Sequence, residues 1–322
     1  MNNWNFNAFV ENTKEVAIAG HIRPDGDCIG SCMALYHYIK DNYPTVDVRV
    51  YLEEISNKFF YIKDADSTIM HGVPTDATPD LFISIDCGDK DRLGFAAVLL
   101  DRAGNTLNID HHISNTKFAK ENWVRPDAAA ACEILCDIFE EDRIGYDTAV
   151  ALYTGIIHDS GVLKYSNTTK NTLNAAGMLI TKGIPFTDII NDSFYQKTYL
   201  QNQILGRALL ESVMFYDGKC IFTAISRKDM EFYGVTSADL DGIVNQLLIT
   251  EGVEVAIFLY ELDMQQYKVS LRSNKYIDVS KIAQRFSGGG HVRAAGCTMN
   301  GRVHDIINSL SGEIANQMTV KE

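Results

Sequence analysis

The chain has 322 residues, of which 46% are hydrophobic and 22% charged, so it is long enough for two domains with separate cores. Its 29 basic and 42 acidic side chains give a formal charge of −13, which argues against general binding of long nucleic acid, where phosphate contacts dominate affinity. The sequence has no apolar run of membrane-spanning length, no secretory signal and no Cys-x-x-Cys pair among seven scattered cysteines. We therefore expect a cytoplasmic protein with reduced thiols and no membrane attachment.

In chain order, apolar strand patterns alternate with helical ones through the first half of the sequence. Strands are expected at 15–20, 46–52, 80–86 and 106–109, and helices at 29–40, 94–101, 128–142, 147–160, 169–183 and 194–213. This alternation predicts an α/β fold with a mainly parallel sheet flanked by helices. Ligands of such sheets bind beyond the carboxyl ends of the strands.

The pattern changes near residue 214. Three further strands are expected at 219–225, 254–262 and 267–272, with helices at 237–249, 278–286 and 303–318. We predict a first domain over 1–190, a helical linker over 191–213 and a smaller α/β domain over 214–322, with the active site in the cleft between the two domains.

Acidic and histidine side chains gather at four places where a strand or helix ends. Each place alone has an ordinary explanation: a solvated turn, a helix cap, a polar strand end or a polar helix end. The four clusters are His21/Asp25/Asp27, Asp86, Asp110-His111-His112 and His158-Asp159.

Four ordinary explanations would have to hold independently for four clusters at one edge of one sheet, which makes a shared function the better explanation. Crowded carboxylates repel one another unless cations neutralise them. Asp oxygens with a few imidazoles suit Mn²⁺, and also Mg²⁺ or Co²⁺, better than they suit soft metals. Two such ions can clamp the attacking and leaving oxygens of phosphoryl transfer.

These clusters, in this order, resemble the four motifs of the DHH phosphoesterase superfamily. The sequence Ser287-Gly288-Gly289-Gly290-His291 resembles the glycine-rich signature of the DHH-associated C-terminal domain, so the resemblance covers nearly the whole chain. Length and layout are most similar to the oligoribonucleases called nanoRNases, which also remove phosphate from 3′-phosphoadenosine 5′-phosphate (pAp).

The resemblance implies a role for each motif residue. His21 and Asp25 would bind one metal ion, Asp27, His111 and Asp159 the other, and Asp86 would bridge both. His112 would contact the substrate phosphate, and Asp110 would orient a ligand imidazole. A water activated by the two metals would attack phosphorus in line.

The three consecutive glycines also have a physical interpretation that does not depend on the resemblance. Three glycines permit close backbone approach and expose N–H groups to an anion, although a flexible turn is the default for such a run. Arg272 lies on the strand just before it and suits bidentate phosphate contact. With the resemblance, we expect Arg272, Gly288, Gly289, Gly290 and His291 to hold substrate.

Two positions depart from the usual motifs. Val292-Arg293 follows the glycine run where relatives often have proline, and His158 precedes Asp159 where many have threonine. The His158-Asp159 pair also occurs in all-helical phosphohydrolases, but the N-terminal strand pattern argues against that fold. The roles of His158 and Arg293 stay open.

The substrate is expected to be short RNA or a small nucleotide such as pAp. The alternatives are a phosphodiesterase acting on cyclic di-AMP or pApA, an exonuclease acting on single-stranded DNA, and a non-catalytic nucleotide sensor. The acidic charge disfavours the exonuclease, and the presence of all six proposed ligands disfavours the sensor. Relatives often form homodimers, but the sequence leaves the oligomeric state open.

Overall fold

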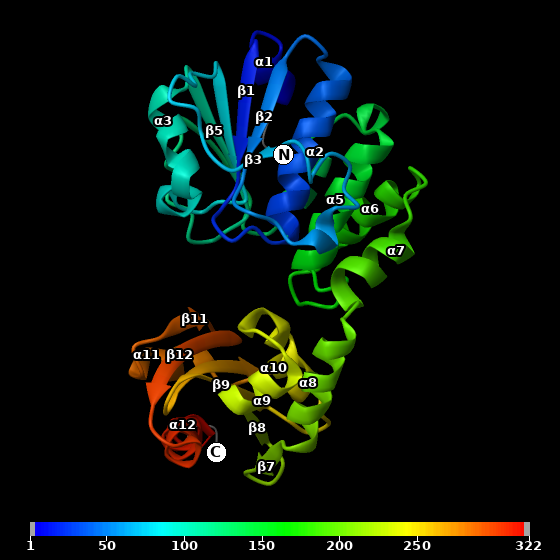
Figure 1. Cartoon of the computed structure of the whole chain (residues 1–322). Coiled ribbons are helices and arrows are strands. Elements are labelled where there is room, and N and C mark those ends of the chain that lie inside the picture. Colours follow the sequence, from blue (N-terminus) through cyan, green and yellow to red (C-terminus); the bar gives the residue numbers. More distant parts are fainter. Residues whose placement is uncertain (1–3, 319–322) are drawn as a thin grey trace. The chain divides into compact units, whose positions relative to one another are not determined.

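The computed structural model describes residues 4–318 of the chain. By packing, the chain divides into two compact units, and the boundary falls between Gln196 and Lys197. Each unit consists of a sheet covered by helices (Figure 1). Within the described residues, no helix is both long and apolar enough to cross a membrane.

The first unit is built on a six-stranded sheet in which every strand pair is parallel, which confirms the predicted fold class. The strand order is β3-β2-β1-β4-β5-β6, so the direction of winding reverses between β1 and β4. Open sheets of this kind bind ligands beyond the carboxyl ends of the strands at the point of reversal. The strands are β1 (Glu15–Ala19), β2 (Asp47–Tyr51), β3 (Ile69–Met70), β4 (Leu81–Ile85), β5 (Asn105–Asp110) and β6 (Glu121–Val124).

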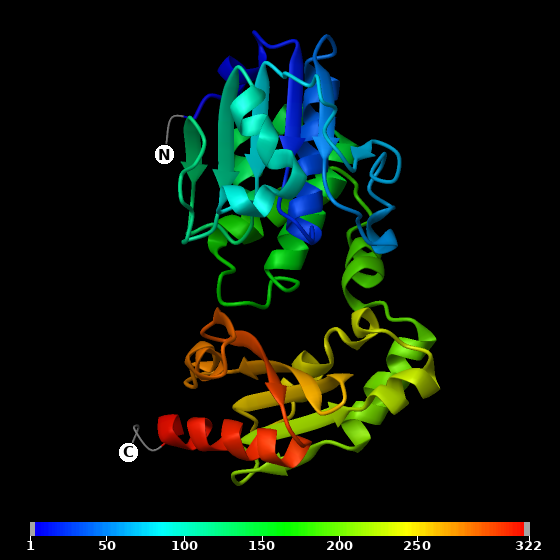
Figure 2. The same ribbon diagram turned by 60° about the vertical axis from the view of Figure 1, so that its left-hand side comes forward.

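Helices cover both faces of this sheet because its strands are apolar on both sides. Along β1, Val16 and Ile18 join the cluster of the larger helices, while Ala17 and Ala19 face the opposite layer. In Figure 2 the cyan segment of η2 and α3 lies on one face of the sheet and the green helices lie on the other. The helices are α1 (Phe6–Val10), α2 (Gly26–Asn42), η1 (Asn57–Phe59), η2 (Lys90–Val98), α3 (Leu99–Arg102), α4 (Ala131–Ile138), η3 (Glu141–Arg143), α5 (Tyr146–Asp159), α6 (Lys170–Ile180), α7 (Phe186–Ile190) and the π-helix η4 (Asn191–Tyr195).

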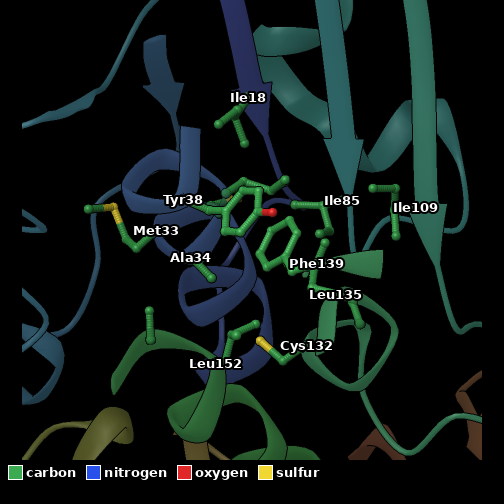
Figure 3. Packing of buried hydrophobic residues seen from close by; sticks show 14 of the residues in the cluster. Ile18, Met33, Ala34, Tyr38, Ile85, Ile109, Cys132, Leu135, Phe139 and Leu152 are labelled. Carbon is green, nitrogen blue, oxygen red and sulfur yellow. The ribbon is translucent and has the colours of Figure 1, made fainter. Parts of the chain in front are cut away.

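The core of this unit joins the sheet to α2, α4 and α5 (Figure 3). The rings of Tyr38 and Phe139 stack with centroids 3.7 Å apart, and Figure 3 shows them next to Ile18 and Ile85 of the sheet. Burial of each such side chain contributes about 1.5–3 kcal/mol, so the packing fixes these helices against the strand ends that carry polar residues.

Four expected helices are interrupted. The segment 128–142 divides into α4 and η3, and 237–249 divides into η5 (Ser237–Leu240) and α10 (Ile243–Leu248). The segment 94–101 divides into η2 and α3, and Gly94 has φ +55° inside η2, a conformation that breaks a helix. The stretch 194–213 is not one helix either. Thr198 and Gln201 form a capping box, which begins a new helix after η4.

The second unit has its own six-stranded sheet, in the order β11-β12-β10-β9-β8-β7. Only β8 and β9 run parallel; the other neighbours are antiparallel. Helices α11 and α12 pack on one face, and α8 and α10 on the other. The elements are α8 (Tyr199–Leu210), β7 (Val213–Phe215), β8 (Cys220–Ile225), α9 (Arg227–Tyr233), η5 (Ser237–Leu240), α10 (Ile243–Leu248), β9 (Val255–Asp263), β10 (Gln266–Ser273), α11 (Val279–Arg285), β11 (Gly289–His291), β12 (Ala294–Asn300) and α12 (Val303–Met318).

Candidate metal centre

The carboxyl ends of β1, β4 and β5 bring polar residues to one edge of the first sheet. His21 follows β1, Asp86 follows β4 directly, and Asp110 is the last residue of β5. Because these strands are parallel neighbours in register, the three residues emerge on the same side. This is also the point where the winding of the sheet reverses, the usual place for a ligand.

Asp86 lies between two groups of imidazoles. Its Oδ2 is 3.4 Å from Nε2 of His21, and its Oδ1 is 3.3 Å from Nε2 of His111. Its backbone has φ +53°, a strained conformation for a residue other than glycine, and its N–H is fixed by the carbonyl of Ile109. Each carboxylate oxygen of Asp86 thus lies near the ring of a different histidine.

A second group forms where α2 and α5 cross. Nε2 of His111 is 3.2 Å from Oδ2 of Asp159 and 4.0 Å from Oδ2 of Asp27. The crossing is close because Gly30 and Gly155 face it: a Cβ on Gly30 would lie 2.6 Å from the carbonyl oxygen of Ala151. The two helices thereby place one carboxylate from each beside the same imidazole.

The N-terminus of α4 holds Asp27 in place. The backbone N–H groups of Ala131 and Cys132 donate to Oδ2 and Oδ1 of Asp27, at 2.6 and 3.1 Å. Free N–H groups at the start of a helix stabilise a negative charge. Sequence reasoning missed this support, because backbone donors 104 and 105 positions further along the chain leave no sequence signal.

Asp25 and Cys28 lie on the His21 side of the centre. Oδ1 of Asp25 caps α2 by accepting the N–H groups of Asp27 and Cys28, and its Oδ2 is 3.6 Å from Nε2 of His21. The Sγ of Cys28 also lies close to His21 and Asp86. Burial raises the pKa of this thiol well above its usual range, so it remains protonated and donates to the His21 carbonyl.

The carboxylates and imidazoles of the centre shift the pKa values of one another. Burial raises the pKa of Asp27 to about 7, with the charge of Asp86 adding to the effect. Burial and the same neighbouring carboxylates raise the pKa of Asp159 as well. Burial by itself lowers the pKa of His21 and of His111, but carboxylate contacts outweigh it and raise these pKa values to about 12 and about 10.

The residues of this centre could hold divalent cations. Oδ1 of Asp86 is buried and receives no hydrogen bond from the residues that the structure describes, although a buried carboxylate oxygen without a partner is costly. Ligand atoms of Asp86, His111 and His112 lie within 4.8 Å of one another, as do those of Asp27, His111 and Asp159. Oxygen and imidazole donors of this kind suit hard or intermediate divalent ions.

Asp110 fixes the orientation of the His112 ring through a hydrogen bond to Nδ1. Nδ1 of His112 donates to Oδ1 of the fully buried Asp110 at 2.7 Å, and Nδ2 of Asn115 donates to Oδ2 at 2.6 Å. Asn115 also reaches the buried Asn108 on β5. Neither asparagine was expected from the sequence, since Asn108 stands in an apolar strand and Asn115 in an unremarked loop.

His158 packs against the start of α2 and against aromatic rings. Its ring lies against Phe59 and Phe194, its Nε2 is 3.0 Å from the hydroxyl of Ser193, and burial lowers its pKa to about 4. A Cβ on Gly26 would lie 2.2 Å from this ring. His158 therefore supports the start of α2, where Asp25 and Asp27 lie.

The remaining expected site residues belong to the second unit. Arg272 lies at the end of β10, and its Nε donates to Asn245 at 3.2 Å. The glycine run forms part of a strand pair: Gly289–His291 is β11 and pairs with β12. Gly288 and Gly290 are needed for this close pairing, because a Cβ there would lie 2.2 and 2.5 Å from the carbonyl oxygens of Gly296 and Ala294.

The first unit thus brings eight expected residues together at one sheet edge, and the second unit carries the other five. The first group is His21, Asp25, Asp27, Asp86, Asp110, His111, His112 and Asp159, and the second is Arg272, Gly288, Gly289, Gly290 and His291.

Comparison with known proteins agrees with this layout. Over 293 residues, the chain is 29% identical to the bifunctional oligoribonuclease and PAP phosphatase NrnA of Thermus thermophilus, which covers 89% of this chain and 84% of that protein. It is 25% identical to the cyclic-di-AMP phosphodiesterase PdeA of Listeria monocytogenes, over 89% of this chain and 45% of that protein. The fold matches an exopolyphosphatase-related protein from Bacteroides fragilis with a TM-score of 0.88 at 21% identity, covering 98% of this chain and 96% of that one.

Two family models divide the chain in the same way as its motifs. Residues 15–156 match the N-terminal domain of the DHH family, and residues 217–316 match the DHHA1 domain. The chain therefore belongs to the DHH family of phosphoesterases and carries a DHHA1 domain in its C-terminal part.

Proposed function

We propose that this chain is a metal-dependent phosphoesterase that hydrolyses short oligoribonucleotides to mononucleotides and removes phosphate from pAp. The position of Asp86 carries this proposal. Its two oxygens face His21 on one side and His111 on the other, at 3.4 and 3.3 Å. A buried carboxylate so placed is suited to join two cations.

In this proposal the ligands divide into two sets that share Asp86. His21 and Asp25 hold one ion, and Asp27, His111 and Asp159 hold the other. Mn²⁺ suits this mixture of carboxylate oxygens and imidazoles, with Mg²⁺ and Co²⁺ as alternatives. When bound, such a pair of ions activates a water molecule and neutralises charge on the phosphate.

Besides the two ions, the side chain of His112 contacts the substrate in this proposal. Because an ionised carboxylate can only accept, Asp110 fixes the proton of His112 on Nδ1. Nε2 of His112 is then the nitrogen left for a phosphate oxygen, to which it donates in the imidazolium form, where both ring nitrogens carry protons. Asn115 holds Asp110 in turn, so the imidazole keeps its orientation while substrates exchange.

The substrate is expected to be small for two reasons. A chain of net charge −13 attracts anions only where cations or arginines gather, and the Thermus relative is named for oligoribonuclease and PAP phosphatase activities. We assign Arg272, His291 and the backbone of Gly288–Gly290 to the phosphate or nucleotide away from the scissile bond.

A second candidate is hydrolysis of cyclic di-AMP or of its linear product pApA. The Listeria relative with that activity in its name favours it, but this chain matches only 45% of that protein. An exonuclease acting on long single-stranded DNA and a nucleotide sensor without turnover are less favoured.

Product analysis in the presence of Mn²⁺ tests the proposal. The substrates are pAp, pApA, an RNA of three to five nucleotides, cyclic di-AMP and a long single-stranded DNA. We expect the highest kcat/KM for pAp and the short RNA. A preference for cyclic di-AMP would favour the second candidate, preference for the long strand would reject the first, and tight nucleotide binding without hydrolysis would indicate a sensor.

A further inference from the structure

Two charged side chains outside the metal centre hold one loop of the second unit in place through hydrogen bonds. The loop, residues 274–277, joins β10 to α11 and follows the strand end that carries Arg272. Its backbone N–H groups bind Glu254, and its carbonyl groups bind Arg293. Such matched contacts leave the loop little freedom.

Glu254 is the buried member of this pair and accepts hydrogen bonds from the loop. The residue is 3% exposed, and its Oε1 accepts the N–H groups of Tyr276 and Ile277 at 2.7 and 2.9 Å. The N–H of Lys275 reaches both of its oxygens, at 3.0 and 3.1 Å. A buried carboxylate is tolerated only when it is bonded in this way, so the loop and Glu254 fix each other.

Arg293 is the other member of this pair and donates hydrogen bonds to the loop. Its Nη1 donates to the carbonyl oxygen of Ile277 at 2.8 Å, and its Nη2 donates to that of Lys275. The planar guanidinium can reach both carbonyls at once, which the single ammonium of a lysine does less well. Arg293 is therefore held by the same loop that Glu254 holds.

Arg293 also lies in the turn that directly follows His291. The turn joins β11 to β12, and its backbone is tied on both sides: the N–H of Ser273 donates to the carbonyl of Arg293 at 3.1 Å, and that of Val279 to the carbonyl of Val292 at 3.0 Å. One residue further along, Arg272 pairs with Ala294 across β10 and β12. Arg293 thus stands where the strand end of Arg272 and the hairpin of His291 meet.

We propose that Arg293 is a positioning residue: with Glu254, it sets where the His291 hairpin lies relative to Arg272, and so sets the affinity for the nucleotide. This rests on the proposed function, in which His291 and Arg272 hold substrate. Arg293 acts through His291 and does not contact the reacting atoms.

Steady-state kinetics with pAp test this role. Arg293→Ala is expected to raise KM about tenfold, the scale of one lost charge-assisted hydrogen bond, while kcat stays within about twofold. Arg293→Lys should recover part of the loss. The matched control is Arg285→Ala, which removes an exposed arginine that pairs with Glu313 on α12 of the same unit, and it should leave KM unchanged.

A double-mutant cycle separates positioning from general destabilisation. If Arg293 acts through His291, the KM effect of Arg293→Ala disappears in a His291→Ala background. Additive effects, an unchanged KM in Arg293→Ala, or a loss in kcat alone would overturn the proposal. If Arg293→Ala does not fold, the Arg293→Lys variant carries the same cycle.

Amide hydrogen exchange tests the role of Arg293 independently of whether the chain hydrolyses nucleotides. Arg293→Ala should speed amide exchange in residues 288–296, with exchange in the first unit unchanged. A wild-type chain that hydrolyses none of the nucleotides would reject the proposed function, while the exchange result would still decide the role of Arg293. Unchanged exchange in the hairpin would reject that role.

Discussion

Gly155 on α5 lies so close to Asp27 on α2 that a Cβ on Gly155 would stand 2.4 Å from Oδ1 of Asp27. The same Cβ would stand 2.3 Å from Sγ of Cys132, at the start of α4. Real Cβ atoms do not approach so closely, so any side chain at 155 must displace the carboxylate or the helix that holds it. The absence of a side chain at this position is therefore a condition for the acidic cluster.

Gly155→Ala tests this condition. We expect Mn²⁺ affinity to fall by about 10–100-fold, the scale seen when the support of a metal ligand is lost. Titration calorimetry measures the affinity. The matched control is Gly177→Ala on α6, where a Cβ meets nothing within 4 Å; it should retain affinity and raise helix stability slightly. Equal affinities in the two variants would contradict the close approach.

Metal binding should depend on pH through the protons that the ions displace. Without metal, the folded-state pKa values of His21 and His111 are raised to about 12 and about 10, so both hold protons at neutral pH. The stabilising effect of a raised pKa is complete below the unfolded value, about 6.5 for histidine, and is lost as the pH rises towards the folded value. Asp27 has a folded pKa of about 7, so its contribution to the free energy of unfolding falls between about pH 4 and pH 7.

The metal-free protein should therefore become less stable, and its metal affinity greater, as the pH rises. We expect the increase in melting temperature caused by Mn²⁺, relative to a chelator, to be larger at pH 8 than at pH 6. Differential scanning calorimetry measures both. An increase that is the same at the two values, or larger at pH 6, would show that these groups do not hold the displaced protons.

Asp110→Asn should separate the orientation of His112 from metal binding. The amide has one acceptor oxygen where the carboxylate has two, so it cannot accept from both His112 and Asn115. We expect the imidazole to lose its orientation and kcat for pAp to fall by about 10–100-fold. Metal content should stay near that of the wild type, because Asp110 contacts His112 and Asn115. Loss of metal in this variant would mean that Asp110 is itself a ligand.

The glycines of the β11 strand should not be equivalent. Gly290 has φ +142° and would place a Cβ 2.5 Å from the carbonyl oxygen of Ala294, whereas a Cβ on Gly289 meets nothing within 4 Å. Gly290→Ala should weaken pAp binding and destabilise the second unit, and Gly289→Ala should change stability little. KM and melting temperature measure both effects; similar losses in the two variants would favour a flexible anion-binding loop over a paired strand.

The sequence predicts the part of the centre that depends on strand ends. His21, Asp86 and Asp110 follow apolar strands, and parallel strands bring their carboxyl ends to one edge, so their proximity follows from pattern alone. The mainly parallel sheet and the three strands at 219–225, 254–262 and 267–272 follow from the same apolar patterns.

The contacts between distant elements could not be predicted in this way. Asp27 meets Asp159 because two helices cross at Gly30 and Gly155, and a glycine inside a helical pattern does not reveal its partner. The amides of Ala131 and Cys132 are backbone groups without any side-chain signature. For the glycine run alone a flexible turn is the default. Its strand pairing could not be predicted, because β11 has only three residues and pairs through its backbone.

The central claim is that Asp86 joins two metal ions in a phosphoesterase, and Asp86→Ala tests it most directly. The matched control is Asp91→Ala, which removes an exposed carboxylate five residues further along. Bound Mn²⁺ and the rate of pAp hydrolysis are measured in both variants and in the wild type. We predict about two ions and full turnover in the wild type and the control, with fewer ions and no detectable turnover in Asp86→Ala. Near-normal turnover in Asp86→Ala would contradict the account.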